Sequence, residues 1–76
     1  MVGATRVNDK ARFVECQQVW ICVSMFGIFQ RVKGIISGVY HDRYSVYRSD
    51  HRQYIDFPLS GKQGEGEGAA WLEPRV

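Results

Sequence analysis

The stretch 32–47 constrains the fold of this chain most strongly. It reads Val-Lys-Gly-Ile-Ile-Ser-Gly-Val-Tyr-His-Asp-Arg-Tyr-Ser-Val-Tyr, and two runs suited to β-strands flank the polar turn at 41–43, a pattern typical of a hairpin. Gly34 and Gly38 lie inside the first run, where glycine usually marks a bulge, a bend or the close approach of another backbone. All three occur where one sheet folds over to close a small barrel. The stretch therefore predicts a bent hairpin at the centre of a small β-barrel.

Five short stretches have the composition or the alternation of β-strands. They are residues 18–26, 32–40, 44–49, 53–59 and 69–73, the last of which is either a strand or a single helical turn. Pro58 cannot donate a hydrogen bond to a ladder, so it marks a strand end or a sheet edge. Trp71 and Leu72 are expected to dock the last stretch onto the barrel. The pattern predicts one all-β domain over residues 11–76.

The first of these stretches, 18–26, is apolar on both faces. One face carries Val19, Ile21 and Val23, and the other carries Trp20 and Cys22. A continuous apolar run has no clear period, so a helix remains an alternative here. A strand with two apolar faces is either covered by another element or lies at a subunit interface, and we therefore expect a homo-oligomer.

Three segments are expected to lie outside the strands. Residues 1–10 are small, polar and charged and predict a flexible arm, with a short helix over 10–17 as an open alternative to extended chain. Residues 25–31 predict a loop or bend, whose Phe26 and Phe29 rings either serve binding or close one end of the core. Residues 60–68 are glycine-rich and predict a flexible exposed loop.

Composition narrows the class of protein further. A chain of 76 residues buries only about 60% of the surface that its unfolded form exposes, so self-association would help its thin core. The net charge of +2 neither requires nor excludes a nucleic-acid partner. The longest apolar run is too short for a membrane span and residues 1–10 lack the apolar segment of a signal peptide, so we expect a cytoplasmic protein with no membrane partner.

The two cysteines, Cys16 and Cys22, have no second pair with which to form a structural zinc site. In an extended segment they would lie roughly 20 Å apart, too far for a disulfide. We expect both to be reduced and mostly buried, which fits the cytoplasm.

The order of strands resembles SH3-like small barrels of the Tudor, KOW and chromo-barrel kind. The resemblance covers residues 18–74 and is carried by Gly34-Ile35-Ile36, Tyr44-Ser45-Val46 and Trp71-Leu72-Glu73-Pro74. It implies an all-β, five-stranded SH3-like barrel with a flexible N-terminal arm.

A narrower resemblance is to the plasmid-type (type II) dihydrofolate reductases, tetrameric barrels of similar length. Residues 34–40 and 44–46 are similar to their second and third strands. Their pore carries Val-Gln-Ile-Tyr on the next strand, where this chain reads Arg-Gln-Tyr-Ile-Asp over 52–56. Gln53 matches, but the isoleucine and tyrosine are transposed, which exchanges the sides they face. The pore lysine has no counterpart, and residues 61–68 are an insertion.

The candidate contact residues are aromatic and basic side chains around the central hairpin. They are Phe29, Tyr40, Arg43, Tyr44, Tyr47, Arg48, Arg52 and Gln53. Arginines supply phosphate contacts and tyrosines supply stacking platforms for unpaired bases, but the same residues also suit a groove for a peptide or a methylated cation. The alternative to either is a polar hairpin surface with its tyrosines packed flat on the sheet.

No catalytic motif accompanies these residues. The His-Asp and Asp-His neighbours at 41–42 and 50–51 lie in turns and do not form a base with its orienting partner. We therefore predict a non-enzymatic binding module without cofactor or metal, which acts on a protein partner or on itself. The alternative is an SH3-like protein that binds RNA or DNA through the tyrosines and arginines of the hairpin, and a type II reductase-like enzyme is a less favoured one.

Overall fold

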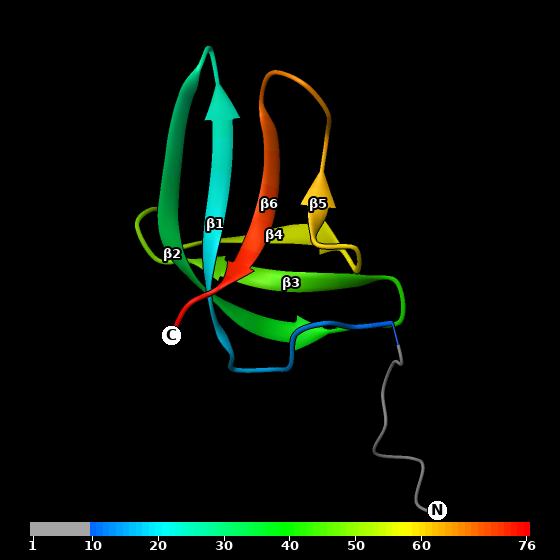
Figure 1. The fold of residues 1–76 in the computed structure, drawn as a ribbon. Helices are drawn as coiled ribbons and strands as arrows, with labels where there is room; N and C mark the ends of the chain where they lie inside the picture. Colours follow the sequence, from blue (N-terminus) through cyan, green and yellow to red (C-terminus); the bar gives the residue numbers. More distant parts are fainter. Residues whose placement is uncertain (1–9) are drawn as a thin grey trace, which may run out of the picture.

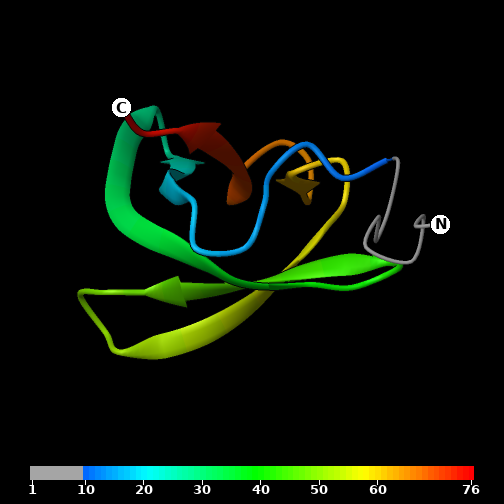
Figure 2. The same cartoon turned by 90° about the horizontal axis from the view of Figure 1, so that it is seen from below.

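Six antiparallel strands form a single sheet in residues 10–76, the part of the chain that the computed structural model describes (Figure 1). The strands are β1 (Gln18–Met25), β2 (Ile28–Val39), β3 (Arg43–Arg48), β4 (Gln53–Pro58), β5 (Lys62–Gln63) and β6 (Ala69–Pro74). Their order in the sheet is β4-β3-β2-β1-β6-β5. The sheet curls into a half-barrel, in which β3 and β4 run across one end of β1, β2 and β6 (Figure 2). The all-β prediction is confirmed, and the helical alternatives for 18–26 and 69–73 are wrong.

The long strand β2 belongs to both halves of the sheet. Residues 28–35 pair with β1, whereas residues 34–39 pair with β3. At the crossover, a Cβ on Gly34 would lie 2.8 Å from Ile21 Cδ1 and 3.2 Å from Val46 Cγ1. The register also shifts between Ile36 and Gly38, as in a β-bulge. Gly38 therefore adjoins a bulge, as the sequence predicts, whereas Gly34 marks the close approach of two side chains rather than of another backbone.

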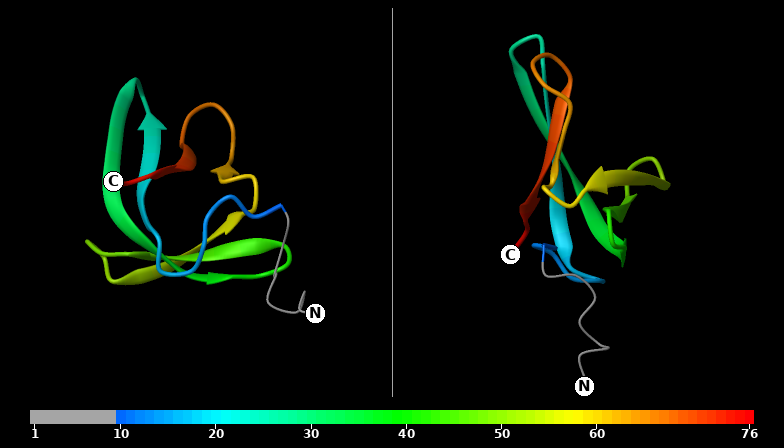
Figure 3. Two further views of the ribbon diagram at one scale, coloured as in Figure 1. Left: turned by 60° about the horizontal axis from the view of Figure 1, so that its bottom comes forward. Right: turned by 90° about the vertical axis from the view of Figure 1, so that its right-hand side faces the viewer.

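The core lies on the concave side of the half-barrel. Its buried members are Phe13, Val19, Ile21, Ile36, Tyr44, Val46, Phe57 and Leu72. Residues 10–17 pass across this side between the two halves of the sheet (Figure 3) and contribute Phe13. Leu72 confirms that the last strand docks onto the core, while Trp71 is only half-buried on the other face.

Residues 10–17 form turns and bends rather than the short helix considered for them. Cys16 has a positive φ of 72°, and its N–H donates to the carbonyl of Ile36 at 2.7 Å. Both cysteines are free; Cys22 is buried as expected, but Cys16 is exposed because its turn points the side chain outward. The expected N-terminal arm lies outside the described residues, apart from Lys10.

The loop expected over 25–31 is wrong. Met25 pairs directly with Ile28, so only Phe26 and Gly27 connect β1 to β2. Both have positive φ, 52° and 75°, which is the conformation of a type I′ turn and matches the twist of the flanking strands. Phenylalanine is not a usual residue for such a turn, so the sequence does not reveal it.

The glycine-rich segment is exposed along most of its length, but it is attached at several points. It contains β5, a short strand that pairs with β6. The prediction of five strands did not include it. Gly61 is buried, and its N–H donates to the carbonyl of Pro58 at 2.9 Å. Near its other end, Glu67 accepts a hydrogen bond from the Phe26 N–H. The segment therefore touches the turn between β1 and β2.

Candidate binding surface

Exposed apolar side chains gather at the tip of the β1–β2 hairpin. Met25, Phe26, Ile28 and Phe29 are 45%, 78%, 59% and 55% exposed. We call these four residues the hydrophobic tip. Large exposed apolar patches on soluble proteins are candidate contact surfaces.

The tip is exposed because the other half of the sheet does not reach it. Val23 and Ile28 continue the concave face that buries Ile21 further along β1. The neighbouring strand β3 pairs with β2 only from Gly34 onward, so within residues 10–76 the other half of the sheet does not cover this end. A shallow cavity of about 170 Å³ opens there, lined by Val23, Met25, Phe26, Ile28 and Gln30.

The convex face of β1, β2 and β6 carries a layer of aromatic and arginine side chains. The Phe29 ring centroid lies 5.8 Å from that of Trp71, and Trp71 Nε1 donates to Glu73 Oε2 at 2.8 Å. The guanidinium of Arg31 lies 4.6 Å from the Trp20 ring centroid, within the range of a cation–π contact. Phe29 thus joins the hydrophobic tip to this convex layer.

Cys22 lies within the same layer, in register with Arg31 and Trp71. Burial raises the pKa of the Cys22 thiol, and the nearby negative charge of Glu73 raises it further. The thiol is therefore neutral and contributes as an apolar packing group.

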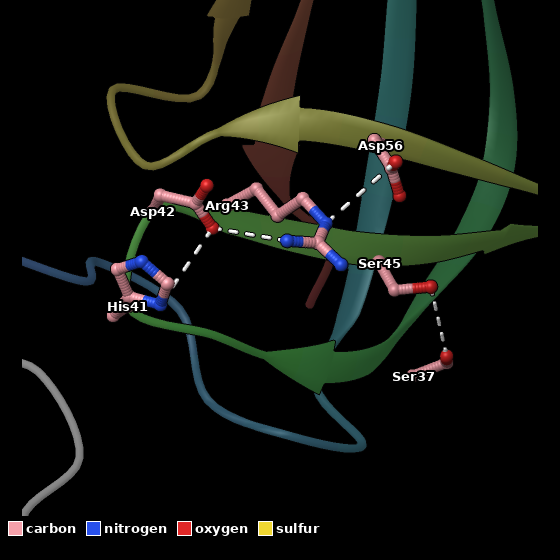
Figure 4. Close-up of polar contacts among 6 residues, drawn as sticks. All are labelled: Ser37, His41, Asp42, Arg43, Ser45 and Asp56. Atoms are coloured by element: carbon pink, nitrogen blue, oxygen red, sulfur yellow. Dashed lines mark hydrogen bonds and ion pairs between the residues drawn. The ribbon is translucent and has the colours of Figure 1, made fainter.

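The turn between β2 and β3 leads into a polar cluster around Arg43, one of the sequence-predicted residues (Figure 4). Arg43 Nη1 lies 3.1 Å from Asp42 Oδ1, and Arg43 Nε lies 3.7 Å from Asp56 Oδ2. His41 Nδ1 is 4.0 Å from the same Asp42 oxygen, and the guanidinium of Arg43 lies 4.7 Å from the Tyr40 ring centroid. Two carboxylates therefore offset the charge of Arg43.

Arg48 and Gln53 face each other across the β3–β4 ladder. Arg48 forms a bidentate ion pair with Asp50, in which Nε donates to Oδ1 at 2.6 Å and Nη2 donates to Oδ2 at 3.1 Å. The hydrogen bond from Arg48 lowers the pKa of the Asp50 carboxyl below its usual range. Arg52, in the turn after β3, is exposed with a φ of 53°.

The two remaining predicted tyrosines lie on opposite faces of β3. The Tyr47 ring centroid lies 5.1 Å from that of Tyr54 on the convex face of β3 and β4, with the two rings tilted by 57°. Tyr44 is fully buried, because its place in the alternation turns it to the concave side. Tyr44 is therefore a core residue rather than a surface contact residue.

The structure does not bring the predicted residues together. The exposed or half-exposed ones lie in four separate places. These are the β2–β3 turn, the Tyr47–Tyr54 pair, the end of β3 at Arg48, and the first half of β2, which carries Phe29. Met25 and Ile28 are not among the sequence-predicted residues, because a loop over 25–31 assigns neither of them to a face of the sheet. The signal that could have found them is the alternation of 19–25 continued through a two-residue turn.

Within 10–76, no three His, Cys, Asp or Glu side chains are grouped so that they could hold a metal ion. The same residues include no helix with the length and apolar character needed to cross a membrane.

Comparison with known proteins returned no match to a family model, to a curated protein or to a solved structure.

Proposed function

We propose that this chain is a small, non-enzymatic binding module of the SH3-like kind, which acts through a protein partner or a second copy of itself. The order β6-β1-β2-β3-β4, with β2 shared between two halves, supports the likeness to SH3-like small barrels. The observation that carries the proposal is the hydrophobic tip, where four large apolar side chains are exposed at the end of one hairpin. Burial of such an apolar surface against a protein partner is favourable, because it removes the surface from water.

The charge distribution favours a protein partner over nucleic acid. Nucleic-acid affinity comes chiefly from Lys and Arg side chains that neutralise phosphates. Here Arg43 is paired with Asp42 and Asp56, and Arg48 with Asp50. A phosphate would have to displace these carboxylates, which weakens the nucleic-acid alternative.

The reductase-like alternative has less support than the nucleic-acid alternative. Gln53 is exposed at the start of β4, but the residues after it have exchanged sides relative to that family. Ile55 turns inward and packs against the core, whereas Tyr54 points outward and is 68% exposed. A pore lined in the family's manner would need the opposite arrangement.

Site-specific photo-crosslinking tests the proposal. A benzophenone amino acid replaces Phe26 in the hydrophobic tip or, as the control, Tyr54, an exposed aromatic residue on β4. Each purified protein is irradiated alone and in an extract of its natural source. We expect adducts from position 26 that excess wild-type protein suppresses and that excess Phe26→Ser protein does not. Equal adducts from both positions, or none from position 26, would refute a contact role for the tip.

A further inference from the structure

Within residues 10–76, no strand pairs with the outer edge of β2 over its first half. Residues 28–33 pair with β1 on one side, but β3 joins the other side only from Gly34 onward. Figure 1 shows this half of β2 as the outermost strand of the sheet. Its residues 28–31 are all exposed. An open edge of this length is a template for pairing with another strand.

The register determines which backbone groups point to the open edge. In a two-residue hairpin, the pair that flanks the turn, Met25 and Ile28, exchanges hydrogen bonds, and such pairs then alternate along the ladder. The backbone groups of Ile28, Gln30 and Val32 therefore point to β1, and those of Phe29 and Arg31 point outward. The next residue in this phase confirms it, because the Lys33 carbonyl accepts from the Ser49 N–H of the β3 side at 3.2 Å.

This phase allows few ways to pair two copies about a two-fold axis. Outward-pointing residues must face each other, which leaves Phe29 opposite Phe29, Arg31 opposite Arg31, or Phe29 opposite Arg31 of the second copy. The first uses only the end of the strand next to the turn. The second sets like charges opposite each other, which is unfavourable.

The third arrangement is complementary at every position. Phe29 faces Arg31 of the second copy, and this contact extends the arginine–aromatic layer of the convex face. On the concave face, Ile28 meets Val32 of the second copy, and Gln30 meets its own symmetry mate. Ile28 and Gln30 line the shallow cavity at the tip, so the second copy would cover part of it.

The edge of β4, one of the two terminal strands of the sheet, suits this role less well. Pro58 ends β4 and cannot donate a hydrogen bond, and Asp56 places a charge along the strand. Both features are common protections of an edge against pairing.

We propose that two copies of this chain associate by antiparallel pairing of residues 28–32 of β2, centred on Gln30, to form one continuous sheet. The inference rests on the proposed function and names its partner as the second copy. The test needs to separate this register from a non-specific apolar contact at the tip.

Disulfide trapping tests the register directly. Residues opposite each other without mutual hydrogen bonds have Cα atoms about 4.5 Å apart, within the range for a disulfide. In a Cys16→Ser background, which removes the exposed native thiol, Gln30→Cys should form a covalent dimer under mild oxidation. Tyr54→Cys in the same background is the matched control and should stay monomeric. Failure of Gln30→Cys to crosslink above that control overturns the proposal.

Charge variants at one position give a second test by sedimentation equilibrium of the full chain. Phe29→Glu sets a carboxylate opposite Arg31 of the second copy and should retain the dimer. Phe29→Arg sets like charges opposite each other on both sides of the axis and should weaken association about tenfold. Phe29→Arg with Arg31→Glu should restore it. Equal loss in both single variants indicates a purely apolar contact and overturns the register.

The wild-type protein distinguishes failure of this inference from failure of the proposed function. We expect its mass to rise from monomer to dimer with concentration. A monomer at every concentration, together with position-26 adducts to another protein, overturns self-pairing and leaves the proposed function standing. A monomer without such adducts overturns both.

Discussion

The Tyr44 hydroxyl accepts a hydrogen bond from the backbone N–H of Phe13 at 3.2 Å, and the two rings meet edge to face at 5.5 Å. The same hydroxyl accepts from the N–H of Arg12 at 2.6 Å. One side chain of β3 thus fixes the segment before β1 across the open side of the half-barrel. This relationship explains why a tyrosine, and not a phenylalanine, occupies a fully buried position.

Removing that hydroxyl should destabilise the protein more than its size suggests. Tyr44→Phe leaves the N–H groups of Arg12 and Phe13 without their acceptor, and an unsatisfied buried donor costs about 1–3 kcal/mol. Urea denaturation should show this loss in the free energy of unfolding. Tyr54→Phe is the matched control, because Tyr54 is 68% exposed and its change should be close to zero. Equal effects in the two variants would contradict the anchoring role.

The crossover at Gly34 should reject even one additional methyl group. A Cβ there would lie 2.8 Å from Ile21 Cδ1, closer than side-chain carbons pack, so Gly34→Ala should destabilise the fold by about 1–3 kcal/mol. The double variant Gly34→Ala with Ile21→Val removes the clashing methyl group and should recover part of the loss. Thermal or urea unfolding of both variants measures the coupling. Additive effects would show that the clash is relieved elsewhere.

The sequence predicts the architecture of this protein better than its candidate surface. Gly34 and Gly38 interrupt an otherwise apolar strand, and such interruptions have few physical explanations, so the bend and the bulge could be foreseen. The two-residue turn could not, because Phe26 adopts a left-handed backbone that its side chain does not favour. That one turn decides the faces of Met25 and Ile28.

The ion pairs could not be predicted from the sequence either. Arg43 and Asp56 are distant in sequence and meet only because β3 and β4 are in register. Alternation along β3 assigns Tyr44 and Tyr47 to opposite faces, but which face is buried depends on the curl of the whole sheet. Composition alone therefore groups residues that the fold separates.

The two cysteines should differ strongly in reactivity. Cys16 is exposed, whereas Cys22 is buried and its thiol pKa is raised by burial and by the charge of Glu73. Because the thiolate is the nucleophile, a disulfide reagent should modify Cys16 rapidly in the native protein and Cys22 only on unfolding. Cys16→Ser should remove the fast phase and leave the slow one. A fast phase that persists in Cys16→Ser would place Cys22 at the surface.

The Arg48–Asp50 pair should be visible as a shifted titration. The hydrogen bond from Arg48 lowers the Asp50 pKa from its ordinary value of 3.8, so the folded state binds its proton less readily than the unfolded state does. The pair's contribution to stability is therefore present above the ordinary pKa and is lost as the pH falls through the lower, folded value. Carboxyl chemical shifts followed by NMR between neutral and acid pH measure this. Arg48→Met should return the Asp50 pKa toward 3.8, while Arg43→Met, at the other end of β3, should leave it unchanged. An Asp50 pKa that does not move in Arg48→Met would show that the pair does not hold in solution.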